Sequence, residues 1–206
     1  MTSSRFETAA DTGKTRRRIV LLSAVMAGLT ALGACAGNQG VIYNKNFTAG
    51  YSPDSLAALR TPLLVETFGA PVAGVSQAAV TASTVEGLRA SGPRWARFGY
   101  SGNPGDAPNP PYRLRFAYGA ETGFSRQDFC KTDREPGNVS TDGSSARAVV
   151  ALCRGERFVS IAEGSPGLGT DIGSERFSNF VGAIGRQVMP RENPVLDDEC
   201  LFRVCG

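Results

Sequence analysis

The chain contains no histidine among its 206 residues. Histidine is the side chain whose ordinary pKa lies closest to neutral pH, so it is the usual general base in hydrolases and a frequent zinc ligand. Its absence excludes Ser-His-Asp and Cys-His mechanisms and most zinc hydrolases. A binding protein is therefore favoured over an enzyme, and we expect no metal and no cofactor.

Long apolar runs are also missing. The longest apolar run covers residues 19–32 and has 14 residues, whereas a membrane-spanning helix needs about 20. Arg16, Arg17 and Arg18 precede it, and Leu-Gly-Ala-Cys at 32–35 closes it. A basic segment, a short apolar run and small residues before a cleavage point are typical of a secretory signal peptide.

The sequence at 32–35 resembles the lipobox of bacterial lipoproteins. That resemblance implies that residues 1–34 are removed and that Cys35 is acylated and holds the protein to a membrane. Each buried methylene contributes about 0.8 kcal/mol, and one chain alone binds only marginally, but the several chains of these lipoproteins make a permanent anchor. The next residue is Ala36 rather than Asp, which by the same resemblance implies the outer membrane, with the domain facing the periplasm.

The route of export stays open. Residues 15–20 (TRRRIV) fit a twin-arginine signal, which would imply export in a folded state, and they fit an ordinary charged signal segment equally well.

The chain is expected to have no net charge once the signal peptide has been removed. The whole chain has a net charge of +3, but cleavage removes five basic and two acidic residues and leaves 17 of each sign. A strongly electropositive nucleic-acid binder is therefore not indicated. We expect a signal peptide at 1–34, a flexible tether at 35–50 and a single domain at 51–206, which is long enough for a sizeable core.

Four cysteines remain after the anchor, namely Cys130, Cys153, Cys200 and Cys205. An even number in an exported chain predicts disulfides, for which three pairings are possible. We favour Cys130 with Cys153 and Cys200 with Cys205. A zinc site is the alternative, although the chain has neither histidine nor a CxxC pair.

Hydrophobic periodicity, serine caps and proline stops predict the order of elements. Helices are expected at 52–60, 76–91 and 174–189, and strands at 63–68, 94–101, 112–119, 146–154 and 157–164. The long polar loop 120–145 is expected to be linked to the following strand by a disulfide through Cys130. This order predicts an α+β two-layer sandwich, with a mostly antiparallel sheet of four to five strands and helices packed on one face.

One arrangement in the pattern indicates binding. Alternation along 94–101 and 112–119 places Trp95, Arg97, Arg113 and Arg115 together on the outward side of the sheet. Guanidinium groups beside an indole bind phosphate or carboxylate, as found on lipid headgroups, lipopolysaccharide or an acidic envelope protein. The alternative is a solvated sheet face on which the arginines protect a strand edge.

Carboxylates are the remaining candidates for catalysis. A periplasmic enzyme acting on cell-wall glycan would need a cleft with two acidic residues, drawn from Glu66, Glu86, Glu121 or Glu163. The acidic cluster at 197–199 is expected to be solvated. The glycine-rich segment 164–173 lacks the Gly-Lys-Ser/Thr and GxGxxG patterns of phosphate-binding loops and is expected to be a flexible connection.

The layout resembles the small α/β lipoproteins of the bacterial envelope, including the lipopolysaccharide-assembly lipoproteins. The residues after the lipidated cysteine, Ala36-Gly37-Asn38, depart from the motif that those proteins carry there. The resemblance implies a membrane-anchored binding, scaffolding or assembly module. The alternative is the carboxylate-dependent enzyme described above.

Overall fold

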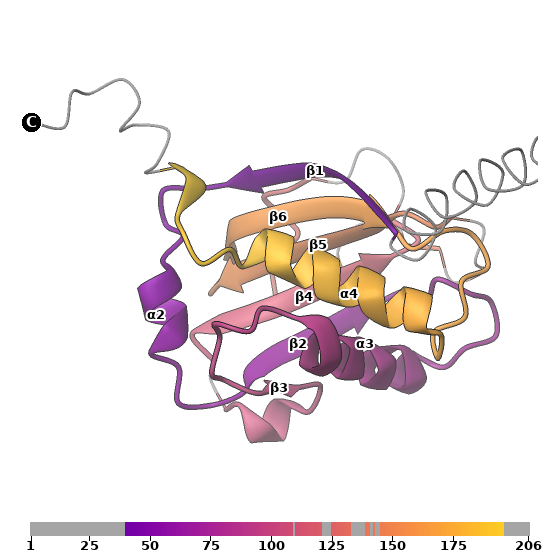
Figure 1. Ribbon diagram of the computed structural model, residues 1–206, viewed down its shortest axis with the longest axis horizontal. Coiled ribbons are helices and arrows are strands. Elements are labelled where there is room, and N and C mark those ends of the chain that lie inside the picture. Colours follow the sequence, from indigo (N-terminus) through magenta and orange to yellow (C-terminus); the bar gives the residue numbers. More distant parts are fainter. Residues whose placement is uncertain are drawn as a thin grey trace, which may run out of the picture. The chain divides into compact units, whose positions relative to one another are not determined.

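A six-stranded mixed sheet organises the part of the chain that the computed structural model describes, which is residues 40–108, 110–120, 125–132, 139–140, 142 and 145–195 (Figure 1). The strands are β1 (Val41–Phe47), β2 (Leu63–Phe68), β3 (Tyr100–Ser101), β4 (Tyr112–Tyr118), β5 (Ala148–Arg154) and β6 (Arg157–Ser165). Their order across the sheet is β1-β6-β5-β4-β2-β3. All the described residues belong to one compact unit, residues 39–206.

The sheet changes from antiparallel to parallel pairing at β4. The pairs β1–β6, β6–β5 and β5–β4 are antiparallel, whereas β4–β2 and β2–β3 are parallel. Helix α3 (Gln77–Ser91) returns the chain to the end of the sheet at which β2 begins, and such a crossover allows parallel pairing. The α+β class is confirmed. The expected sheet of four to five mostly antiparallel strands is matched only roughly, because the sheet has six strands and two of its five pairs are parallel.

The described helices begin where serine caps predict. They are α2 (Pro53–Ala57), α3 and α4 (Glu175–Val188), and their caps Ser52, Ser76 and Ser174 each accept a hydrogen bond from a main-chain N–H in the first turn. This contact satisfies a donor that the helix itself leaves unpaired. Figure 1 shows α3 and α4 side by side over one face of the sheet.

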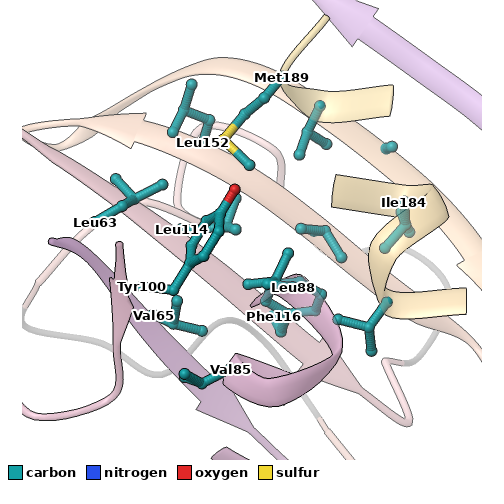
Figure 2. Close-up of a cluster of buried hydrophobic side chains, with 14 of the residues drawn as sticks. Leu63, Val65, Val85, Leu88, Tyr100, Leu114, Phe116, Leu152, Ile184 and Met189 are labelled. Atoms are coloured by element: carbon teal, nitrogen blue, oxygen red, sulfur yellow. The ribbon is translucent and has the colours of Figure 1, made fainter. Parts of the chain in front are cut away.

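The main core lies between these two helices and the sheet. Leu88 from α3, Ile184 from α4 and Phe116 from β4 meet there, and all three are buried (Figure 2). Helices α3 and α4 pack closely because Gly182 of α4 faces Ser91 of α3. A Cβ at position 182 would overlap Ser91. The expectation of helices on one face is therefore correct.

A structured segment covers the other face of the sheet. Phe129 and Cys130 are buried there in a second cluster, whose sheet residues are Ala117, Val149, Ala151, Cys153 and Ile161. The favoured disulfide between Cys130 and Cys153 is confirmed, with Cα atoms 5.6 Å apart. Cys200, Cys205 and Cys35 lie outside the described residues.

Residues 41–47 are not part of a tether. They form β1, an edge strand paired with β6 from Val41–Ser165 to Phe47–Ser160. A bulge between Ile42 and Asn44 interrupts the register, so the two partly buried apolar side chains, Ile42 and Phe47, do not alternate with polar ones. The sequence pattern consequently hid this strand.

The expected strand 94–101 is also wrong, because only Tyr100 and Ser101 pair with β2. A turn at residues 93–96 follows α3, closed by a hydrogen bond from the N–H of Ala96 to the carbonyl oxygen of Pro93, and Arg97 comes directly after it. The indole N–H of Trp95 donates a 3.0 Å hydrogen bond to the carbonyl oxygen of Met189. This bond holds the turn against the end of α4.

Candidate functional site

The four residues predicted to share one outward face do not do so. Arg113 and Arg115 lie on β4 under the segment 125–132 and are 8% and 2% exposed. Trp95 lies in the turn after α3, and Arg97 comes directly after that turn. The expectation of a common solvated face is wrong, because the disulfide-bonded segment covers the arginines on β4.

Arg113 and Arg115 bind the chain itself. Their guanidinium groups donate hydrogen bonds of 2.6–3.0 Å to main-chain carbonyl oxygens, those of Phe129, Cys130, Lys131 and Gly155. The carboxylate of Glu66 pairs with Arg113 at 3.4 Å and with Arg115 at 2.9 Å. We call Glu66, Arg113 and Arg115 the back-face clasp, because they hold the covering segment to the sheet.

The clasp has the electrostatics of a buried ion pair. Burial lowers the pKa of Arg115, while the adjacent carboxylate of Glu66 acts in the opposite direction. The Arg115 guanidinium also lies over the ring of Phe68, 4.5 Å from its centroid. An anion from solution would have to displace these internal partners, so the clasp is a structural feature rather than a ligand site.

The candidate catalytic carboxylates lie apart. Glu163 on β6 pairs with Arg147 at 2.6 Å and with Arg126 at 3.6 Å, and Glu66 has the two arginines of the clasp. Glu86 is exposed on α3, whereas Glu121 and the cluster 197–199 lie outside the described residues. None of the four hollows that the described residues line beside β1, α3 and α4 has two of these carboxylates in its lining.

An open groove with a basic lining lies where α4 ends. It has a volume of about 550 Å³, and its lining residues are Gly92, Pro93, Arg94, Trp95, Arg186, Met189, Pro190 and Arg191. A second hollow of about 410 Å³ shares Arg94, Trp95 and Arg191 with it and adds Arg97 and Asp54 to the lining. We call the two together the Trp95 groove.

The arginines of the Trp95 groove are available to a ligand. Arg94, Arg97 and Arg191 are exposed, and they form no hydrogen bond or ion pair with any residue that the structure describes. Arg186 donates to the carbonyl oxygen of Ser91. Exposed arginines around an indole of fixed position provide charge-assisted, two-pronged binding of phosphate or carboxylate and an apolar surface beside it.

A further basic hollow lies at the same end of the sheet. It has a volume of about 690 Å³ and is lined by Arg154 and Arg157 from the β5–β6 turn and by residues 48–50, which follow β1. The hydroxyl of Ser160 donates to the carbonyl oxygen of Val188 and so joins β6 to the end of α4. This end of the domain is therefore rich in arginine, although residues 35–206 carry equal numbers of acidic and basic residues.

The sequence pattern indicated two of the five residues, Trp95 and four arginines, that give the Trp95 groove its character. It singled out Trp95 and Arg97, and it missed Arg94, Arg186 and Arg191. Arg186 and Arg191 lie on either side of Pro190, which ends the helix predicted at 174–189. Their position at this helix end is the one local feature of the sequence that groups them. Their approach to Trp95 depends on the packing of α4 against the turn after α3.

The chain matches no protein-family model, and no curated protein or solved structure is similar to it. Within the described ranges, no helix is both long enough and apolar enough to cross a membrane. The same part of the chain holds no group of three or more His, Cys, Asp or Glu side chains arranged to hold a metal ion.

Proposed function

We propose that this protein is a lipid-anchored protein of the bacterial cell envelope whose folded domain binds an anionic ligand in the Trp95 groove. The protein acts as a binding or scaffolding module rather than as a catalyst. The observation that carries this proposal is the set of three exposed, unpartnered arginines around Trp95 in the described structure. The lipobox resemblance at 32–35 supports the location.

The groove favours an anion with an apolar portion. Trp95 is partly buried and packs against the core, so its ring is held in place without a ligand. Arg94 and Arg191 line both hollows of the groove, and one phosphate or carboxylate group bound between them would gain charge-assisted hydrogen bonds. Because these groups are exposed, binding would weaken as salt shortens the Debye length to about 10 Å at 0.1 M.

Neutralising two groove arginines tests the proposal. In the double variant Arg94→Gln/Arg191→Gln, the affinity for tripolyphosphate and for a hexaglutamate peptide is expected to fall about tenfold or more, because each lost charge-assisted hydrogen bond contributes about 1.5–3 kcal/mol before solvent screening. Trp95 is the only tryptophan in the chain, so its fluorescence reports occupancy of the groove directly.

The matched control is Lys45→Gln/Arg60→Gln, which removes the same charge from exposed positions that line neither the groove nor the neighbouring basic hollow. This variant is expected to bind both probes as the wild type does. If neither probe changes the fluorescence of Trp95 in the wild type, or if the control loses as much affinity as the groove variant, the groove is not an anion site.

A further inference from the structure

The end of the domain opposite the Trp95 groove carries exposed apolar side chains. Val41, Tyr43 and Leu168 are 66%, 55% and 73% exposed, and they are the exposed large hydrophobic residues of the described chain. Val41 pairs with Ser165 at the end of β6, and Tyr43 lies at the bulge between Ile42 and Asn44. Because Leu168 follows Ser165 by three residues, the three residues lie at the same end of the sheet. We call them the apolar end.

A tight turn fixes Leu168 in its exposed position. The flanking residues Gly167 and Gly169 have φ values of +99° and +65°, a region that side-chain-bearing residues rarely adopt. The hydroxyl of Thr170 donates to the carbonyl oxygens of Pro166 at 2.8 Å and Gly167 at 2.9 Å. The glycine-rich segment is therefore a structured turn that presents a leucine, rather than a flexible connection.

The chain enters the domain beside this turn. Gly40 lies against Ser165 and Pro166, where a Cβ would overlap their main-chain atoms. Gly40 follows Cys35 by five positions, and a fully extended chain of that length spans at most roughly 18 Å. An acylated Cys35 would consequently keep Gly40, which is next to Val41 of the apolar end, within that distance of the bilayer.

We propose that the apolar end rests on the surface of the bilayer that holds Cys35, an inference that depends on the proposed lipid anchor. Tyrosine suits this position because its ring is apolar and its hydroxyl reaches the wet headgroup layer. The guanidinium of Arg176 lies against Gly167 in the same turn and is exposed, so it can meet lipid phosphates. The exposed carboxylates Asp171 and Glu175 lie on the helix side of the turn.

This orientation restricts the source of the anion that binds in the Trp95 groove. β1 runs from the apolar end toward the groove, and its seven residues span about 23 Å. Figure 1 shows that α4 runs in the same direction as β1 from end to end of the sheet. With the apolar end on the bilayer, the groove faces away from it, so its ligand comes from the periplasmic side rather than from headgroups of the anchoring leaflet.

Bromolipid quenching tests the contact. The mature lipidated protein is reconstituted into vesicles of phosphatidylethanolamine and phosphatidylglycerol with brominated acyl chains. In L168W, the added tryptophan is expected to lose roughly half of its emission, because a side chain resting at the interface lies about 5–10 Å into the headgroup boundary. The wild type, with Trp95 alone, and R157W, with a tryptophan at the opposite end, are expected to keep their emission.

Mass spectrometry of the same samples separates failure of this inference from failure of the anchor. Acylated L168W whose added tryptophan is no more quenched than that of R157W would overturn the membrane contact and leave the anchor intact. A blue shift that depends on protein concentration and not on bromine would show that a second copy covers the apolar end, which also overturns the contact. A chain without acyl groups at Cys35 would overturn both proposals.

Discussion

Replacing Arg115 by leucine is expected to lower the free energy of unfolding by about 3 kcal/mol, because the change removes a buried ion pair and leaves two carbonyl oxygens of the covering segment without their donor. The substitution removes the 2.9 Å ion pair with Glu66 and the hydrogen bonds to the carbonyl oxygens of Phe129 and Lys131. Equilibrium denaturation by urea measures the change. The variant should also expose the covering segment 125–132 to hydrogen exchange.

Two matched variants show whether the effect belongs to the clasp. Arg115→Lys keeps the charge but cannot hold a carboxylate and two carbonyl groups with one planar fork, so an intermediate loss is expected. Arg157→Leu makes the same chemical change at an exposed arginine of β6 and should alter stability by less than about 0.5 kcal/mol. Equal losses at positions 115 and 157 would show that Arg115 is not part of a clasp.

Removing the disulfide is the second large expected effect. The double variant Cys130→Ser/Cys153→Ser opens a link between residues 23 apart in the sequence, and a loop of this length contributes about 3 kcal/mol in the chain-entropy model. Both cysteines are fully buried, and the hydroxyls that replace them add an unfavourable burial. Thermal and urea unfolding of the double variant measure the loss.

The clasp and the disulfide hold the same segment, so their effects should not add. Once the disulfide is absent, the segment 125–132 detaches more readily, and Arg115→Leu then has fewer native contacts to remove. The triple variant is expected to lose at least about 0.5 kcal/mol less than the sum of the two changes, as residues that share partners do. Full additivity would mean that the disulfide and the clasp stabilise the fold independently.

Local signals in the sequence predicted most of the described elements. β2 occupies the expected residues 63–68, and α4 begins after its cap Ser174, as the phenylalanine and valine periodicity indicated. β1 escaped prediction because its bulge breaks the alternation and because most of its side chains are exposed. The parallel pairing of β2 with β4 depends on the path of the chain between them, which local patterns do not encode.

The alternation along β4 correctly predicted that Arg113 and Arg115 share one face of the sheet. The prediction that this face is exposed to solvent was wrong. Arg113 and Arg115 point away from the helices, and the segment 125–132 covers them. This segment is polar in sequence, but its Phe129 is buried against the sheet. Sequence periodicity indicates that the two faces of a strand differ in polarity. It does not indicate whether solvent or another part of the chain covers each face. The same limit applies to Arg94, Arg186 and Arg191, whose gathering around Trp95 depends on the packing of the turn after α3 against the end of α4.

The proposed function divides the domain into two chemically distinct ends. Apolar side chains and the entry of the chain lie at one end of β1, and exposed arginines lie around Trp95 at the other. The two ends therefore differ in charge and in polarity, although residues 35–206 carry equal numbers of acidic and basic residues. Such a distribution suits a protein that is held at one end and binds at the other.

Mass spectrometry of the N-terminal peptide, taken from protein purified out of bacterial membranes, tests this arrangement most directly. The peptide is expected to begin at Cys35 and to carry acyl chains on that residue. A mature chain that begins at another residue, or one with a free thiol at Cys35, would contradict the lipid-anchored binding protein proposed above.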